Sequence, residues 1–197
     1  MLDDITALNR YMKLDESRKL VEFHPGLLKL MTLRKWDQVF PDNIPNYEEL
    51  TKSYHNIGYA WCGVADGKPV CAFGIVPLWR GVGEVWMVTD VELPLYGRTF
   101  HRVAKEMFDI YIGELLMNRL QCTVHSRNFQ AIRWIKKMRF LEEGLLQKYG
   151  PDGEDFYIFA RLSNGRDFES EGASATPTAP RARPGSSANA EGARTAH

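Results

Sequence analysis

The segment Asn128-Phe-Gln-Ala-Ile-Arg-Trp-Ile-Lys-Lys-Met-Arg-Phe-Leu-Glu-Glu-Gly144 decides the fold of this 197-residue chain. Its apolar residues Ala131, Ile135 and Met138 fall on one face of a helix over residues 128–138, and Asn128 is a favourable N-cap. A strand over residues 140–146 follows, and a second strand over residues 156–162 comes after a Pro-Asp-Gly turn. The segment therefore predicts a helix followed by a pair of strands.

The residues before this segment predict a parallel strand pair. Residues 84–89 and 120–125 are rich in β-forming side chains, and a long amphipathic helix is expected between them over residues 95–117. A strand, a helix and a second strand in this order imply a parallel crossover. The apolar face of the helix comprises Phe100, Val103, Ala104, Met107, Phe108, Tyr111 and Leu115.

A β-hairpin is predicted further upstream, because Asp66-Gly67 separates two β-rich runs. With these two residues as the loop, Pro69 falls opposite Val64 in a non-hydrogen-bonded pair, where its missing N–H costs no ladder bond. The same register places Cys62 opposite Cys71, close enough for a strained disulfide, although two free thiols are expected in a reducing compartment.

The first 55 residues are expected to be helical. Apolar residues between Val21 and Trp36 recur at roughly helical spacing, and Pro41 and Pro45 are expected to end the run. A short helix capped by Asn46 should follow. Any first strand would be short and lie near residues 4–8.

The order of these elements resembles that of the GNAT superfamily of N-acetyltransferases. The segment from Asn128 to Gly144 resembles the family pattern N-x-x-A-I-x-x-Y-x-x-x-G-F-x-x-x-G, and residues 155–161 resemble its last strand. The likeness covers about residues 57–162. It implies an α/β fold over residues 1–162, with a central mixed, twisted sheet, helices on both faces and splayed parallel strands 84–89 and 120–125.

The resemblance also implies an acetyl-coenzyme-A-dependent transfer of an acetyl group to an amine, on a small molecule or a protein. Splayed strands leave a wedge for the pantetheine arm, and the N-terminus of the following helix favours a pyrophosphate. The residues that the resemblance assigns to the cofactor are Val88, Thr89, Gly97, Arg98 and Asn128. Arg98 is equally interpretable as a solvated first-turn residue, and Asn128 as a helix cap.

Glu84 and His125 are the candidate catalytic residues. Glu84 opens the strand before the phosphate loop, where several family members carry a general base. His125 ends the second parallel strand, at the edge where open α/β sheets place ligands. Either side chain also has an ordinary structural interpretation: a solvated carboxylate at a strand end, or a packed histidine.

Several positions depart from the family pattern. The phosphate loop has one glycine and Pro94, and Ile135 and Arg139 stand where the family has Tyr and Gly. Residues 86–97, with Asn128 and the pair at 132–133, resemble the small acetyltransferase-like internal virion proteins of short-tailed phages. The alternative is therefore a catalytically degenerate phage protein whose partners include other virion proteins.

Composition limits the other possibilities. Lys and Arg together number 25, as do Asp and Glu, so the formal net charge is zero and no field attracts nucleic acid. No apolar run reaches the roughly 20 residues of a membrane span, and no signal peptide is recognisable, so a cytoplasmic protein is expected (host cytoplasm or virion if phage-encoded). The three cysteines lack metal-site spacing. Residues 163–197, rich in Gly, Ala, Ser and Pro, are expected to form a disordered tail.

Overall fold

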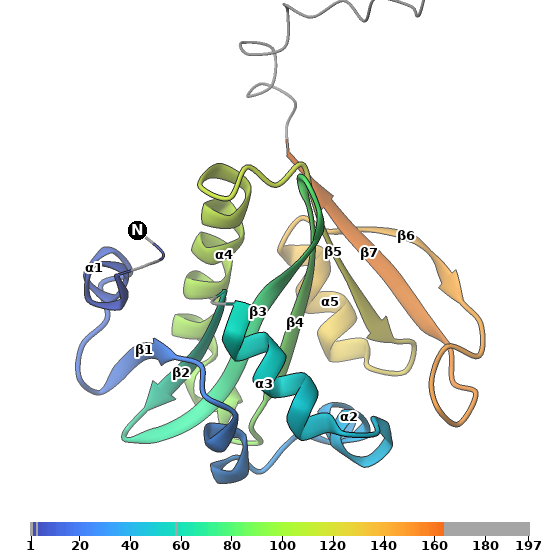
Figure 1. The fold of residues 1–197 in the computed structure, drawn as a ribbon, viewed down its shortest axis with the longest axis horizontal. Coiled ribbons are helices and arrows are strands. Elements are labelled where there is room, and N and C mark those ends of the chain that lie inside the picture. Colours follow the sequence, from blue (N-terminus) through green and yellow to red (C-terminus); the bar gives the residue numbers. More distant parts are fainter. Residues whose placement is uncertain (1, 3, 58, 164–197) are drawn as a thin grey trace, which may run out of the picture. The chain divides into compact units, whose positions relative to one another are not determined.

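The centre of the protein is a seven-stranded sheet in the order β1-β2-β3-β4-β5-β7-β6 (Figure 1). The computed structural model describes residue 2, residues 4–57 and residues 59–163. Strands β4 and β5 are parallel, and every other neighbouring pair is antiparallel. The strands are β1 (Arg18–Glu22), β2 (Ala60–Ala65), β3 (Lys68–Trp79), β4 (Val82–Thr89), β5 (Arg119–His125), β6 (Leu141–Leu146) and β7 (Phe156–Leu162).

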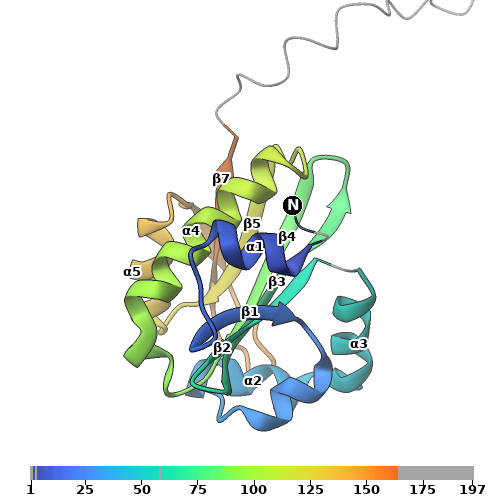
Figure 2. The same ribbon diagram turned by 90° about the vertical axis from the view of Figure 1, so that its left-hand side faces the viewer.

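Helices cover both faces of this sheet. Helices α4 (Gly97–Gly113) and α5 (Phe129–Lys137) lie on one side, and α3 (Tyr47–Ile57) lies on the other (Figure 2). Helix α1 (Ile5–Tyr11) contributes Leu8 to the hydrophobic core on the α4 side of the sheet. Helix α2 (Lys35–Asn43) contributes Phe40 to the core on the α3 side. Alternation along β3 supplies both cores: Phe73 faces α4, and the neighbouring Ala72 faces α2 and α3. The predicted α/β architecture with a mixed sheet is confirmed.

The predicted splay of the parallel strands is also confirmed. Strands β4 and β5 pair only from Val82 with Arg119 to Glu84 with Gln121. Beyond this point both strands continue to Thr89 and His125 without pairing to each other, and they diverge visibly in Figure 1. The sheet therefore opens into a wedge toward the C-terminal ends of β4 and β5.

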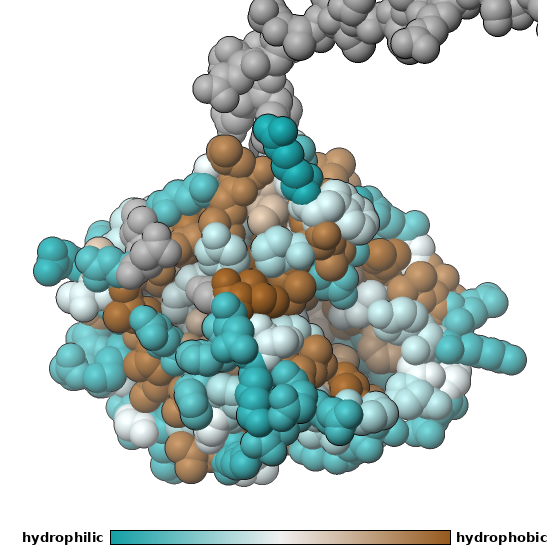
Figure 3. Space-filling model, in the orientation of Figure 1, coloured by the Kyte–Doolittle hydropathy of each residue, from teal (hydrophilic) through white to brown (hydrophobic). Residues whose placement is uncertain are grey.

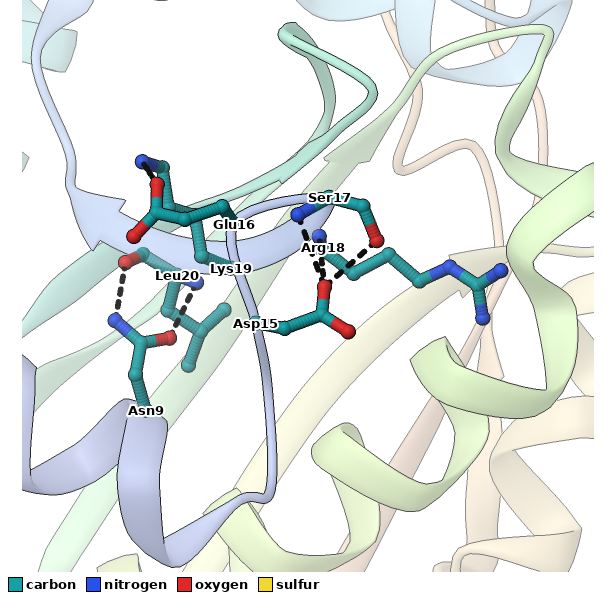
Figure 4. Close-up of polar contacts among 7 residues, drawn as sticks. All are labelled: Asn9, Asp15, Glu16, Ser17, Arg18, Lys19 and Leu20. Atoms are coloured by element: carbon teal, nitrogen blue, oxygen red, sulfur yellow. Dashed lines mark hydrogen bonds and ion pairs between the residues drawn. The ribbon is translucent and has the colours of Figure 1, made fainter.

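The N-terminal third differs from the prediction. Residues 4–8 belong mostly to helix α1, and Val21, expected in a helix, pairs with Cys62 in strand β1. Local polar contacts set this arrangement: Asn9 of α1 accepts from the Leu20 N–H at 2.7 Å and donates to the Leu20 carbonyl at 2.8 Å (Figure 4). Asp15 closes the turn before β1 through hydrogen bonds from Ser17 and Arg18 (Figure 4).

The proline positions in this region also differ from the prediction. Pro41 lies inside α2 rather than ending it, since the helix has only two residues left to run before it stops at Asn43. Helix α3, which begins directly after Asn46, is longer than the expected short helix.

The β2–β3 hairpin confirms the predicted register only for the two pairs next to the turn. Val64 pairs with Pro69 and Ala65 with Lys68, as expected. A β-bulge then shifts the pairing by one residue, so Cys71 lies opposite Gly63, and Cys62 lies opposite Ala72. The prediction that Cys62 faces Cys71 is therefore wrong. The described cysteines are free thiols, and burial raises the pKa of each to about 12.

The remaining boundaries are close to the prediction. A 3₁₀ helix at Leu93–Tyr96 precedes α4, which begins at Gly97 rather than near residue 95 and ends at Gly113 rather than near residue 117. Helix α5 and the final strand pair are confirmed. Within the described part of the chain, no helix is long and apolar enough to cross a membrane. Apart from Ser163, the predicted tail lies outside the described residues.

Candidate active site

A cavity of about 1210 Å³ occupies the wedge between β4 and β5. It is lined by β4 and β5 beyond their last shared pair, by α2 and α3 on one side, and by the start of α4 and one face of α5 on the other. Drug-sized ligands fill roughly 300–1,000 Å³, so this cavity has room for two ligands. The structure brings all the sequence-predicted site residues to its wall: Glu84, Val88, Thr89, Gly97, Arg98, His125 and Asn128.

The backbone of β4 presents polar groups to this cavity. The Gly81 carbonyl accepts from the Arg119 N–H of β5 at 3.0 Å, and the Thr89 N–H donates to α2, whereas the Asp90 N–H turns to Val70 of β3. Backbone groups alternate in direction along a strand, so Met87 presents its N–H and C=O toward the wedge and Val88 presents them toward β3. The candidate main-chain contact for a ligand is therefore Met87, while the Val88 side chain is buried against Phe23.

Thr89 holds helix α2 to the end of β4. Its N–H donates to the Asp37 carboxylate at 2.9 Å, and its hydroxyl donates to the same oxygen. Burial raises the pKa of Asp37, although the two Thr89 hydrogen bonds favour the ionised form. Both polar hydrogens of Thr89 are therefore engaged within the protein, and the residue positions α2 at the mouth of the wedge.

His125 is buried at the end of β5, beside the cavity that it helps to line. Its ring lies between Trp36 and Phe156, at centroid distances of 4.2 and 5.0 Å. The Arg127 N–H donates to Nδ1 at 3.0 Å, so Nδ1 is an acceptor and the proton of the neutral ring sits on Nε2. Nε2 is buried without a partner among the described residues, and burial lowers the pKa of the imidazole. The site thus contains a neutral hydrogen-bond donor rather than a base at this position.

Glu84 lies at the narrow end of the wedge, where β4 and β5 separate. It is half-buried, and the Gln121 side-chain amide on the neighbouring strand donates to its carboxylate at 3.4 Å. Alternation places Glu84 on the same sheet face as Trp86 and Val88, which is the face covered by α2 and α3. Its carboxylate can therefore meet an acceptor that enters from that side.

The opposite end of the cavity is basic. Helix α4 begins at Gly97 with no side-chain cap and no acidic residue in its first turn, and a Cβ built on Gly97 meets nothing within 4 Å. Arg98 from this turn and Arg133 and Lys137 from α5 line the same region. The Gly97 N–H donates to the Pro94 carbonyl of the preceding 3₁₀ turn. The helix N-terminus, the open space at Gly97 and the basic side chains suit an anionic group such as a pyrophosphate.

Asn128 caps helix α5. Its side-chain oxygen accepts from the Ala131 N–H at 3.1 Å, which confirms the structural role considered for it. The amide nitrogen of Asn128 takes no part in this bond and has no hydrogen-bond partner among the described residues, so capping and ligand contact are compatible.

The sequence did not reveal the cavity wall formed by α2 and α3. Tyr47, Leu50, Tyr54 and Ile57 lie on one stripe of α3 and line the cavity. Trp86 and Trp134 are also partly exposed cavity residues, whereas Trp61 is buried. The three- and four-residue spacing of the α3 stripe was the available signal, but it does not say whether such a stripe faces a core or a cavity.

Ile135 also lines the cavity and is buried. It stands where the family pattern has a tyrosine, and its aliphatic side chain provides no hydroxyl. Tyr149, in the β6–β7 connection, also lines the cavity, and its ring packs against Phe156. No group of three or more His, Cys, Asp and Glu side chains able to hold a metal occurs among the residues that the structure describes.

Comparison with known proteins identifies the fold but no close relative. No family model matches the sequence, and no curated protein is similar enough to count as a match. Ard1 from Thermoplasma volcanium aligns over 74% of this chain and 97% of its own, with a TM-score of 0.62 and 16% identity. A GNAT-family acetyltransferase from Bacillus anthracis aligns over 75% of this chain and 95% of its own, with a TM-score of 0.55 and 16% identity.

RimL, a ribosomal alpha-N-protein acetyltransferase in complex with coenzyme A, covers 75% of this chain and 95% of its own, with a TM-score of 0.56 and 14% identity. At 14–16% identity these likenesses concern the fold. Together with the seven-stranded sheet and the open β4–β5 wedge, they lead to one conclusion: the chain has the fold of the GNAT acetyltransferases.

Proposed function

We propose that this protein is an acetyl-coenzyme-A-dependent N-acetyltransferase. The observation that supports this most is the distribution of charge in the wedge. Among the described lining residues, Arg98, Arg133 and Lys137 come from α4 and α5, whereas Glu84 lies where β4 and β5 separate. The remaining cation, Arg34, and the remaining carboxylate, Asp37, both belong to the start of α2. An anionic cofactor would therefore bind on the α4 and α5 side, and a cationic amine at Glu84.

Acetyl-coenzyme A, when bound, supplies the acetyl thioester. The uncapped α4 N-terminus, Arg98, Arg133 and Lys137 would hold its phosphates, and Met87 would pair with its pantetheine amides as an added strand does. His125 would donate its Nε2 proton in a hydrogen bond to an oxygen of the cofactor. Asn128 can add a contact through its free amide nitrogen.

Glu84 would accept the proton that the acceptor nitrogen releases. Loss of this first proton would free the lone pair for attack on the acetyl carbon as the carbon–sulfur bond breaks. The nitrogen would then release a second proton to solvent, and the departing sulfur would take up one proton. The hydroxyl of Tyr149 is a candidate source of that proton, because Ile135 supplies none.

Calorimetric titration with coenzyme A tests the proposal directly. We expect saturable binding of one equivalent, followed by release of free coenzyme A from acetyl-coenzyme A when an amine is added. The assay can use a thiol reagent, since burial raises the pKa of the protein's own thiols to about 12 and keeps them unreactive. Neither heat nor a thermal shift at millimolar coenzyme A would refute the proposal. Binding without turnover for any amine would favour the degenerate virion protein instead.

A further inference from the structure

The half of the cavity that contains Glu84, where the proposed amine acceptor would bind, has a wall that is almost entirely aromatic and aliphatic. Tyr47, Leu50, Tyr54 and Ile57 of α3 face Trp86 of β4 and two aliphatic residues of β3, Val76 and Leu78. The rings of Tyr54 and Trp86 are stacked, with centroids 4.7 Å apart and an interplanar angle of 22°. The two rings cover each other's inner faces, so the stacked pair offers a ligand an outer ring face and the exposed ring edges.

This wall continues to the protein surface. Ile57 and Leu78 are 37% and 39% exposed, and both line the cavity. The space-filling view shows apolar surface in the middle of this face, over the C-terminal end of α3 (Figure 3). An apolar molecule can therefore contact the wall from the surface down to β4.

The aromatic wall is electrically neutral. Burial, then the neighbouring Tyr54 and Asp37, raise the pKa of Tyr47 to about 12, so its hydroxyl stays protonated. Burial and the nearby Glu84 carboxylate likewise raise the pKa of Tyr54. The influence of Glu84 on Tyr54 also indicates that the carboxylate lies beside the ring wall.

Glu84 is the one carboxylate that this half of the cavity offers to a ligand. Of the described acidic residues lining the cavity, Asp37 accepts two hydrogen bonds from Thr89, which leaves Glu84 with a single 3.4 Å contact to Gln121. One carboxylate matches one ammonium group, whereas a polyamine needs several. A peptide needs partners for its main chain, and rings and aliphatic side chains provide few.

We propose that the acceptor is a primary monoamine on a flat, apolar body, an arylalkylamine, with its nitrogen toward Glu84 and its ring against Tyr54 and Trp86. The inference rests on the proposed function for the reaction, but not for binding. Aromatic faces also attract a cation, so ring and ammonium are recognised by the same wall.

Binding of 2-phenylethylamine and of its neutral counterpart 2-phenylethanol to the full chain tests this inference. We expect the wild type to bind the amine about tenfold more tightly than the alcohol, corresponding to about 1.4 kcal/mol. Glu84→Gln should abolish this preference while keeping the side chain's shape. Glu48→Gln makes the same change on a side chain of α3 that does not line the cavity, and it should leave the preference intact. Tyr54→Leu should weaken both ligands.

Acetyl transfer to 2-phenylethylamine, spermidine and an alanine tripeptide separates the two proposals. Faster transfer to spermidine or to the peptide would retain the acetyltransferase function and overturn the arylalkylamine inference. Equal binding of amine and alcohol would also overturn it. If no amine is acetylated but binding of 2-phenylethylamine still depends on Glu84, the binding inference stands and the proposed enzymatic function falls.

Discussion

The main-chain N–H of Arg127 lies 3.0 Å from Nδ1 of His125, and this contact fixes the proton of the ring on Nε2. We predict that His125→Asn, whose side-chain oxygen can still accept from Arg127, will lose the donor and weaken coenzyme A binding about tenfold, the usual effect of one lost hydrogen bond to a buried group. His125→Gln can return an N–H near the position of Nε2 and should recover part of the affinity.

The pH profile separates this role from that of a general base. Because burial lowers the pKa of His125 below the ordinary value of 6.5, the ring loses its charge at a lower pH than a solvated imidazole, and its donor capacity stays constant toward alkaline pH. The wild type and His125→Asn should therefore show profiles of the same shape. An acidic limb in the wild type that disappears in the variant would identify His125 as a base.

Gly97 offers a test that separates the cofactor site from the fold. Its φ of −54° is helical, and a Cβ there meets nothing within 4 Å, so Gly97→Ala should leave stability unchanged or raise it, by up to about 1 kcal/mol. The added methyl would occupy the space expected for the pyrophosphate, and we expect coenzyme A to bind about tenfold more weakly. Gly113→Ala, at the other end of α4 and equally open, is the matched control. Equal affinities for both variants would remove Gly97 from the site.

Asp37 should make stability depend on pH. In the folded protein its pKa is raised above 3.8, the ordinary value expected in the unfolded chain. At a pH between the unfolded-state pKa and the folded-state pKa, the folded protein therefore still holds a proton that the unfolded chain has released. Stability from this group therefore falls as pH rises through that interval. Melting curves from pH 3 to 7 should show Asp37→Asn gaining stability relative to the wild type as pH rises. Asp42→Asn, an exposed acid on the same helix, is the control and should show no such gain.

The β-bulge places Gly63 against the sulfur of Cys71. A Cβ at residue 63 would lie 2.7 Å from that Sγ atom, so Gly63→Ala should destabilise the protein, by about 1–3 kcal/mol, as overpacking does. Adding Cys71→Ala should recover much of the loss, measured as coupling in a denaturation cycle. Gly144→Ala is the comparison in another strand, because its Cβ would meet Ile158 at an ordinary 4.0 Å. Additive effects at residues 63 and 71 would contradict the bulge.

The C-terminal half of the fold could be predicted because its signals are local. Asn128 caps a helix whose apolar face is unambiguous, and the parallel pairing of β4 with β5 follows from two strands joined by a long amphipathic helix. Their splay was implied only by the resemblance to the GNAT superfamily. The bulge after Val64 could not be predicted, since slipping one residue leaves apolar side chains on both faces of a strand that is buried on both sides. Strand β1 was not predicted because its formation depends on pairing with β2, which is distant in the sequence, and on hydrogen bonds with Asn9.

The site divides in the same way. Residues at strand ends and in the first turn of α4, such as His125 and Gly97, were predictable because topology places them at the open edge of a sheet. The wall made by Tyr47 and Tyr54 was not, because an apolar helical stripe has the same pattern whether it covers a core or a ligand. Identifying Met87, and not Val88, as the candidate main-chain contact for a ligand required knowing in which direction each amide points. That direction depends on the register of β4 with β3.

The separation of β4 from β5 also provides an intrinsic reporter. Beyond Glu84 along the chain, β4 does not pair with β5. The N–H of Met87, which points toward β5, can therefore form a hydrogen bond only with solvent or with a ligand. Deuterium should therefore enter Met87 much faster than its neighbour Val88, whose amide is held by β3. A bound pantetheine would slow Met87 selectively, so occupancy of the wedge can be followed at a single amide without any catalytic turnover.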